Sequence, residues 1–287
     1  MSARPTFPRD VVLLGLGLMG RAAASRLADE GFDVAGWNRT PLAEPPSALD
    51  VSEGLELVAQ ASLVVLFLSN SDAVDELLAR IEPDLQAGQV VVDMGSSEPW
   101  RSVDHAARLA EAGIGWVDAP VSGGPEGAES GTLAIMVGGA DEDVMAARAV
   151  LDALGSNVTH LGGPGAGHTA KVVNQTMVGV ILEAVAEGLA LAERAGLDPA
   201  KVSEAVGGGS ADTRPLRAQG PRMIARDYAP RAHVTTMLKD LRMASELGTR
   251  VGVELPCVER VIELAQELVE RGEGELDIGA LHRLRIG

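Results

Sequence analysis

Residues 11–20, Val-Val-Leu-Leu-Gly-Leu-Gly-Leu-Met-Gly, join a short apolar run to three glycines spaced as G-x-G-x-x-G. The apolar run predicts a buried strand, and the alanine-rich pattern over 21–30 predicts a helix directly after it. Between a strand and a helix, Gly15 makes the turn, Gly17 admits a pyrophosphate and Gly20 packs the helix on the sheet. The helix N-terminus then offers amide donors to phosphate. The stretch therefore predicts a dinucleotide-binding fold. The weaker alternative is that the glycines only form a tight turn and bind no ligand.

The same alternation of strand and helix continues to about residue 163. Apolar runs predict further strands at 33–37, 63–68, 90–93, 116–120, 133–137 and 157–160, and helices from about 72, from near 99 and over 141–154. Near-continuous apolar runs are typical of parallel strands that helices cover on both faces. We therefore expect an α/β protein whose first domain, residues 1–163, is a doubly wound Rossmann-type sheet. Pro41, Pro45 and Pro46 argue against a normal crossover helix before Ser52.

Helical patterns alone follow residue 196. They cover 199–206, 215–225, 235–250 and 256–271, without a strand-like run between them. An all-α domain over residues 164–287 is therefore expected, begun by a long helix that starts near Lys171. We expect an active site in a cleft between the two domains.

Ligands of doubly wound sheets bind at the carboxyl ends of the strands, so the loops at 15–20, 38–40, 68–71 and 95–97 should border the cofactor. The second strand ends in Asn38-Arg39-Thr40, without the acidic residue that usually holds the ribose of NAD. Arginine with two polar neighbours suits a 2′-phosphate, so NADP(H) is expected to be preferred, with NAD(H) as a second choice. A polar turn with an incidental arginine is the alternative. The expected cofactor-binding residues here are Gly15, Gly17, Leu18, Met19, Gly20, Asn38, Arg39, Thr40, Leu68, Ser69, Asn70 and Ser96.

Composition excludes several classes of function. With 24 basic and 41 acidic residues the net charge is −17, which repels nucleic acid and anionic membranes. Cys257 is the single cysteine, so no intrachain disulfide can form, and the five histidines show no metal-ligand spacing. We expect no bound metal. No run of 18 uninterrupted apolar residues and no signal-type apolar segment over 1–10 are found, so we expect a cytoplasmic protein.

The long helix carries polar residues at its start and few afterwards. From Val172 to Ala192 its only charges are Glu183 and Glu187, so we expect it to be buried against several neighbours. Because one small helical domain could not cover such a helix, a dimer or larger homo-oligomer is expected. Lys171, followed by Asn174 and Gln175 on the same face, has the profile of a catalytic amine. A lysine that extends to solvent is the alternative.

A second polar stretch, Asp118-Ala-Pro-Val-Ser-Gly-Gly124, follows the strand near 116–120. It contains more glycine and hydroxyl groups than packing requires. Backbone amides at Ser122, Gly123 and Gly124 could form an anion-binding site, although a glycine-rich loop needed only for chain reversal is the alternative.

Four motifs, in order, resemble those of the β-hydroxyacid dehydrogenase family: Gly15–Gly20, Asp118–Gly124, Gly165–Gln175 and Lys239–Leu241. The resemblance covers nearly the whole chain. The family is 6-phosphogluconate dehydrogenase-like and includes 3-hydroxyisobutyrate dehydrogenases, tartronate semialdehyde (2-hydroxy-3-oxopropionate) reductases, and glyoxylate/succinic semialdehyde reductases.

The resemblance implies a role for each matching position. Lys171 corresponds to the catalytic lysine, and the loop of Ser122, Gly123 and Gly124 to the site of the substrate carboxylate. Asn174 and Gln175 match the polar positions that orient the substrate, and Lys239 and Asp240 match a Lys-Asp motif, with Lys239 toward the cofactor and Asp240 toward the substrate. The segment 207–210 resembles a loop that approaches the substrate. At Leu68-Ser69 and Gly95-Ser96 this sequence departs from the residues that many members of the family have. Both positions border the cofactor, so the differences put the affinity of the protein for its cofactor in doubt.

The implied function is NAD(P)-dependent interconversion of a short β-hydroxy acid and its semialdehyde or oxo acid. A 2-hydroxy-3-oxopropionate reductase or a glyoxylate/succinic semialdehyde reductase is expected, with a small carboxylate-bearing substrate. Lys171 would give a proton to the carbonyl oxygen in reduction and take it from the hydroxyl in oxidation. The pKa of a free lysine is about 10.4, so the surroundings of Lys171 would have to lower its pKa. The alternatives are a 3-hydroxyisobutyrate dehydrogenase, an imine reductase, whose proton donor is usually Asp or Tyr, and a non-enzymatic NADP-binding module.

Overall fold

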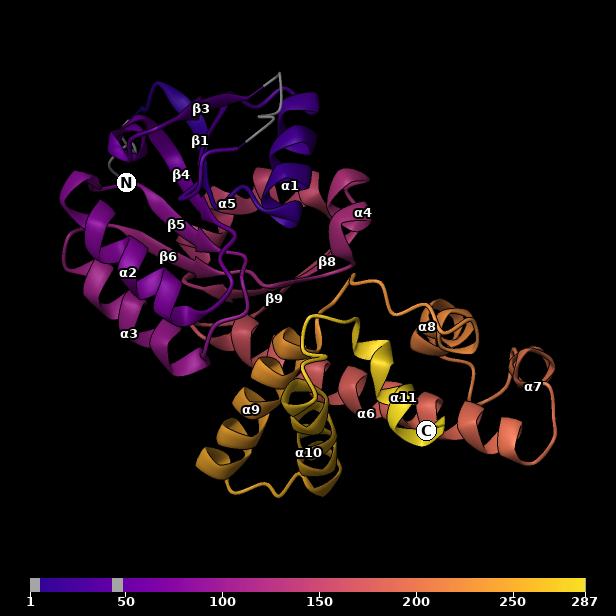
Figure 1. Cartoon of the computed structure of the whole chain (residues 1–287). Coiled ribbons are helices and arrows are strands. Elements are labelled where there is room, and N and C mark those ends of the chain that lie inside the picture. Colours follow the sequence, from indigo (N-terminus) through magenta and orange to yellow (C-terminus); the bar gives the residue numbers. More distant parts are fainter. Residues whose placement is uncertain (1–5, 43–48, 287) are drawn as a thin grey trace. The chain divides into compact units, whose positions relative to one another are not determined.

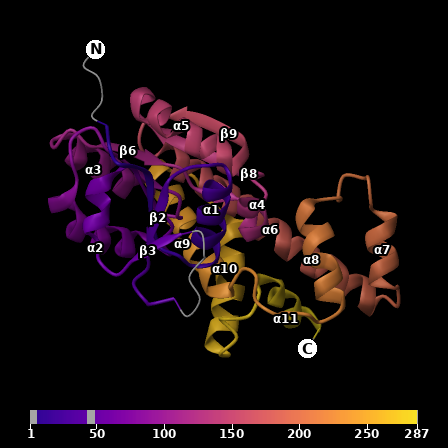
Figure 2. The same ribbon diagram turned by 90° about the horizontal axis from the view of Figure 1, so that it is seen from above.

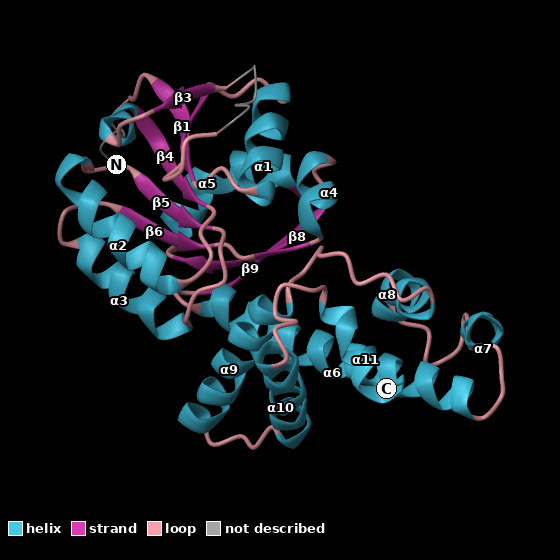
Figure 3. Ribbon diagram, viewed as in Figure 1, coloured by secondary structure: helices cyan, strands magenta, loops and turns pink. Residues whose placement is uncertain are grey.

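The computed structural model describes residues 6–42 and 49–286. The chain forms two compact units, Met1–Lys171 and Val172–Gly287, which we describe one at a time. Unit 1 holds the sheet, and the described part of unit 2 is built from helices, as the cyan and magenta elements of Figure 3 show. The division falls inside one long helix, a little beyond the predicted domain boundary at residue 163.

Unit 1 is organised around a mixed, mostly parallel sheet. Its strands are β1 (Arg9–Leu14), β2 (Val34–Trp37), β3 (Asp50–Ser52), β4 (Ala61–Leu66), β5 (Val90–Asp93), β6 (Gly115–Asp118), β7 (Val121–Ser122), β8 (Leu133–Gly139) and β9 (Gly155–Gly162). They lie in the order β3-β2-β1-β4-β5-β6-β8-β7, with β9 paired to β8. The first six of these are parallel, and their order is that of a Rossmann fold. The predicted fold class is confirmed.

The sequence did not indicate two short strands or one change of direction. β3 and β7 are only three and two residues long and lack an apolar run, because they are not fully buried. β8 runs antiparallel to both β6 and β7, so the sheet is not parallel throughout. Pro45 and Pro46 lie outside the described residues, and no helix forms in the described residues between β2 and β3.

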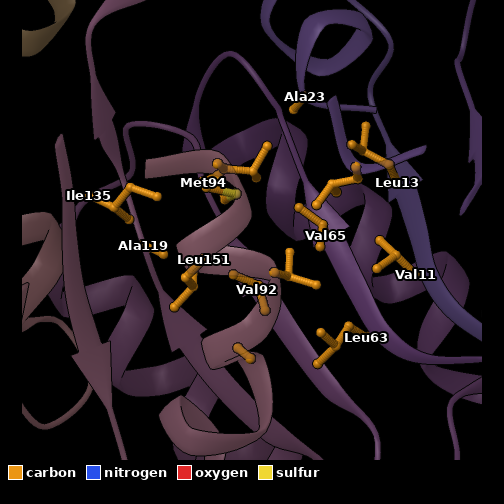
Figure 4. Packing of buried hydrophobic residues seen from close by; sticks show 14 of the residues in the cluster. Val11, Leu13, Ala23, Leu63, Val65, Val92, Met94, Ala119, Ile135 and Leu151 are labelled. Carbon is orange, nitrogen blue, oxygen red and sulfur yellow. The ribbon is translucent and has the colours of Figure 1, made fainter. Parts of the chain in front are cut away.

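Helices cover both faces of this sheet (Figure 1). On one face lie α1 (Leu18–Asp29), α4 (Gly124–Glu129) and α5 (Asp141–Leu154), and on the other α2 (Ser71–Ile81) and α3 (Pro99–Ala110). Alternate residues of each strand serve the two faces: Val11 and Leu13 pack toward α1, whereas Val12 and Leu14 pack toward α2. Figure 4 shows the first of these cores, where side chains from the strands meet Ala23 of α1 and Leu151 of α5. Short 3₁₀ helices η1 (Glu56–Gln60) and η2 (Glu82–Asp84) complete the connections.

The long helix α6 (Ala166–Arg194) connects the two units. It begins five residues before Lys171, so the expectation that Lys171 opens the helix is wrong. Its buried Glu183 forms an ion pair with Arg285, and burial raises the pKa of Glu183 while the guanidinium acts in the opposite direction. By length and composition α6 could cross a membrane, but buried core helices pass the same test, so this is weak evidence.

Unit 2 continues with α7 (Pro199–Ala205), α8 (Arg214–Ile224), α9 (Val234–Val251) and α10 (Pro256–Glu270). The helix α7 packs beside α8, as Figure 2 shows, and α9 packs against α10. The chain ends in η3 (Ile278–His282) and α11 (Arg283–Ile286), which the sequence patterns did not indicate. No strand occurs among residues 172–286, apart from one isolated bridge between His233 and Asp277.

Candidate active site

The three glycines between β1 and α1 occupy different surroundings. Gly15 has a φ of +101°, and a Cβ there would collide with the carbonyl oxygen of Phe67. A Cβ on Gly20 would collide with the carbonyl oxygen of Gly15, so the first turn of α1 packs closely on the end of β1. Gly17 has nothing within 4 Å of its Cβ position and leaves open space beside the helix N-terminus. The loop therefore exposes backbone where a phosphate can approach.

A pocket of about 240 Å³ lies beside this loop, at the carboxyl ends of the strands. It brings together the turn at 15–17, the end of β2 and the end of β4 with the side of α2. Its lining is Gly15, Gly17, Trp37, Asn38, Arg39, Thr40, Phe67, Leu68, Ser69, Ala73, Glu76, Leu77 and Arg80. Of the predicted cofactor residues in unit 1, Leu18, Met19, Gly20, Asn70 and Ser96 are not part of that lining.

Two of the predicted residues hold the local backbone. The Asn38 side-chain oxygen accepts a hydrogen bond from the Leu16 amide at 2.9 Å, and its amide nitrogen donates to the Thr40 carbonyl at 2.7 Å. Asn38 thus ties the glycine turn to the turn that carries Arg39. Asn70 is the N-cap of α2, since its side-chain oxygen accepts from the Ala73 amide at 2.9 Å.

The sequence did not indicate the wall that α2 contributes. Arg80 lies with its guanidinium carbon 5.4 Å from the centre of the Trp37 ring, and Glu76 lies one turn before it. Both side chains are on the exposed face of an amphipathic helix, where charged residues are ordinary, so no sequence signal singled them out. The pocket therefore contains two arginines, Arg39 and Arg80.

These observations fit the adenosine end of a dinucleotide. The open space at Gly17 admits a pyrophosphate, the α1 N-terminus supplies amide donors, and two cationic side chains can meet a negatively charged group. Among residues 6–42 and 49–286, no group of three His, Cys, Asp or Glu side chains is placed to hold a metal ion.

A second cluster in unit 1 joins Lys171 to the glycine-rich loop. The Lys171 ammonium nitrogen donates a hydrogen bond to the Val121 carbonyl oxygen at 2.8 Å, and Lys171 is half-buried. Ser122 follows Val121 directly, and then Gly123 and Gly124 have φ values of +143° and +74°, which L side chains rarely adopt. The lysine and the Ser122–Gly124 loop, which are far apart in sequence, are neighbours.

The predicted polar residues of unit 2 form a hydrogen-bonded chain. The Asn174 amide donates to the Gln175 side-chain oxygen at 2.9 Å, and the Gln175 amide donates to an Asp240 carboxylate oxygen at 2.7 Å. The other Asp240 oxygen lies 3.1 Å from the Lys239 ammonium nitrogen, although Asp240 is only 4% exposed. Residues 207–210 follow α7 and are exposed. The structure thus groups Asn174, Gln175, Lys239 and Asp240 within one unit.

Two family models match the two parts of the chain. Residues 10–162 match the family model for the NAD binding domain of 6-phosphogluconate dehydrogenase, and residues 165–285 match the model described as NAD-binding of NADP-dependent 3-hydroxyisobutyrate dehydrogenase.

Full-length relatives extend the match over nearly the whole chain. The 2-hydroxy-3-oxopropionate reductase of Escherichia coli is 34% identical over 93% of this chain and 94% of its own length. A probable 3-hydroxyisobutyrate dehydrogenase-like protein of Arabidopsis thaliana, named as mitochondrial, is 34% identical over 92% of this chain and 89% of its length. A crystal structure of 3-hydroxyisobutyrate dehydrogenase from Salmonella typhimurium superposes with a TM-score of 0.88 at 26% identity, over 96% of this chain and 99% of that one. This chain belongs to the β-hydroxyacid dehydrogenase family, the 3-hydroxyisobutyrate dehydrogenase-like NAD(P)-dependent enzymes that act on hydroxy acids.

Proposed function

We propose that this NAD(P)-dependent β-hydroxyacid dehydrogenase interconverts a short semialdehyde or oxo acid and its hydroxy acid, as a 2-hydroxy-3-oxopropionate reductase or a glyoxylate/succinic semialdehyde reductase. The observation that carries the proposal is the 2.8 Å hydrogen bond from Lys171 to Val121, which holds an amine beside the loop of Ser122, Gly123 and Gly124. An amine next to a loop of Ser122, Gly123 and Gly124 suits a substrate with a carbonyl and a carboxylate. A local cation also offsets the overall charge of −17, which would otherwise repel such a substrate.

In the proposed mechanism each group of the protein has one role. The amides of Ser122, Gly123 and Gly124 hold the substrate carboxylate, and Lys171 gives a proton to the carbonyl oxygen in reduction or takes it from the hydroxyl in oxidation. Asn174 and Gln175 orient the substrate oxygen, and the buried Asp240 fixes the Gln175 amide. When bound, the nicotinamide cofactor supplies or accepts the hydride.

We also propose that NADP(H) is the preferred cofactor. The end of β2 carries Asn38-Arg39-Thr40 without an acidic residue, and Arg80 adds a second guanidinium to the same pocket. A carboxylate at the end of β2 would repel a 2′-phosphate, whereas an arginine attracts it. Glu76 lies on the wall formed by α2 and is the one acidic group among the described residues of that lining.

A substrate panel tests the proposal. The decrease of NADPH and NADH absorbance is measured with tartronate semialdehyde, glyoxylate, succinic semialdehyde and cyclic imines, and the reverse reaction with 3-hydroxyisobutyrate. We expect NADPH-dependent turnover of at least one semialdehyde or oxo acid. Turnover that is fastest with 3-hydroxyisobutyrate would favour a 3-hydroxyisobutyrate dehydrogenase, and turnover of imines alone would favour an imine reductase. Tight NADPH binding without any turnover would leave a non-enzymatic NADP-binding module.

We further propose that the chain forms a dimer or tetramer and acts in the cytoplasm. Large apolar side chains remain exposed on and beside α6, including Leu191 at 70% and Leu197 at 58% of their surface. A second copy of the chain would cover them. Light scattering of the purified protein is expected to give at least twice the chain mass of 29.7 kDa, and a single monomeric species would contradict this proposal.

A further inference from the structure

The start of α6 is held by a carboxylate from the sheet. Asp118, the last residue of β6, is fully buried. One of its oxygens accepts a hydrogen bond from the Gly165 amide at 2.8 Å, and the other accepts from the His168 amide, also at 2.8 Å. The first amides of a helix have no partner within the helix, so a carboxylate that accepts two hydrogen bonds there stabilises the helix start.

Two glycines allow the first turn of α6 to approach the sheet this closely. A Cβ on Gly167 would collide with the carbonyl oxygens of Asp118 and Met136. A Cβ on Gly138 would lie only 2.7 Å from the Gly167 amide nitrogen. The helix start therefore packs directly on the backbone of β6 and β8.

The imidazole ring of His168 completes the cluster. His168 is fully buried, and neither of its ring nitrogens forms a hydrogen bond with any residue that the structure describes. Nε2 lies 3.6 Å from an Asp93 oxygen and Nδ1 lies 3.9 Å from an Asp118 oxygen, both longer than a direct hydrogen bond. Asp93 and Asp118 are register partners at the ends of β5 and β6, and the imidazole ring lies near both carboxylates. Such unpartnered buried nitrogens are rare and call for an explanation.

We propose that Asp118 is a positioning residue that sets the place of Lys171, and that His168 keeps the Asp118 carboxylate in its capping position. His168 precedes Lys171 by three residues, about one helical turn, so a shift of the capped turn carries Lys171 with it. Asp118 also lies three residues before Val121, whose carbonyl oxygen accepts the Lys171 hydrogen bond. The carboxylate thus joins the helix that carries the amine to the segment that carries the Ser122–Gly124 loop. This inference rests on the proposed catalytic role of Lys171.

The test replaces Asp118 by asparagine, which keeps the shape but presents an NH₂ donor to one of the two amides. Misplacing a reacting group by about 1 Å costs on the order of 10²-fold in rate. We therefore expect kcat of Asp118→Asn to fall by about 10²-fold while the Kd for NADPH, measured by fluorescence titration, stays within about twofold. Hydrogen exchange of the peptide covering 163–170 should become faster in the variant, a readout that needs no turnover.

Asp277 offers a matched control in unit 2. It is 1% exposed and accepts hydrogen bonds from the amides of Arg231, Ala232 and Gly279. Asp277→Asn removes a buried capping carboxylate that also forms an ion pair with Arg222 at 3.2 Å, so it should lower the midpoint of denaturation at least as much as Asp118→Asn does. Its kcat should stay within about twofold of wild type at temperatures where the variant is folded. Equal losses of kcat in the two variants would overturn the positioning role.

His168→Gln serves if Asp118→Asn does not fold. It keeps the backbone amide that Asp118 caps and removes the ring, so faster exchange over 163–170 and a loss of kcat of about tenfold are expected. Wild-type exchange and kcat in this variant, or kcat of Asp118→Asn within about threefold of wild type, would overturn the inference. The proposed function fails separately, if a variant without the Lys171 amine retains turnover.

Discussion

Replacing Lys171 by methionine is expected to lower kcat by about 10²–10⁴-fold, the usual contribution of a positioned general acid or base. Methionine keeps the length and the apolar stem of the side chain but cannot exchange a proton. The lost hydrogen bond to Val121 lies away from the pocket lined by Gly17, Arg39 and Arg80, so the Kd for NADPH should stay within about twofold. Steady-state kinetics with the best substrate of the panel and a separate NADPH titration measure the two effects.

Two further lysine variants separate the chemistry from the charge. Lys171→Arg keeps a cation, but a guanidinium does not release its proton at accessible pH, so the KM should stay near that of wild type while kcat stays low. Lys201→Met removes an exposed lysine of α7 and should leave both constants unchanged. A Lys171→Met enzyme that keeps more than about a tenth of wild-type kcat would refute the proton-transfer role.

The local sequence pattern was sufficient to predict most strands of the sheet and several helices. The apolar run at 11–14 with its glycines predicted β1 and the start of α1, because a buried parallel strand and its turn have strict local requirements. The helix predicted over 141–154 is α5, which begins with three acidic residues and ends at a glycine. β7 could not be predicted in this way, since a strand of two half-buried residues leaves no periodicity.

The start of α6 shows why other features needed the structure. The expectation of a start at Lys171 rested on the apolar run that begins at Val172, and Gly165 and Gly167 before it disfavour a helix locally. The structure begins the helix at Ala166 because Asp118, about 50 residues earlier in the chain, caps it, and because only glycine fits against β6 and β8. Arg80 is similar: its exposed position is ordinary in sequence, and only the fold places it beside Trp37. Such roles depend on tertiary neighbours.

Replacing Arg39 by alanine is expected to weaken NADPH binding by tenfold or more and to leave NADH binding within about twofold. A charge-assisted hydrogen bond contributes roughly 1.5–3 kcal/mol, and about 1.4 kcal/mol corresponds to tenfold in affinity. Arg39 lines the pocket between Asn38 and Thr40, and the Asn38 side chain ties this turn to the glycine loop, so we expect the guanidinium to reach a 2′-phosphate bound in this pocket. Titration of wild type and variant with both cofactors gives the ratio directly.

Arg80 makes the experiment more discriminating, because its guanidinium lies over Trp37 on the other wall of the same pocket. If both arginines meet the 2′-phosphate, Arg80→Ala should also weaken NADPH selectively, and the double variant should bind NADPH and NADH with similar affinity. If Arg80 only packs on Trp37, its loss should weaken both cofactors equally. Arg148→Ala, which removes an exposed arginine of α5, is the matched control. Equal losses of NADPH and NADH affinity in Arg39→Ala, or an NADH preference in wild type, would show that Arg39 is only a polar turn residue, because a contact to the 2′-phosphate cannot affect a cofactor that lacks one.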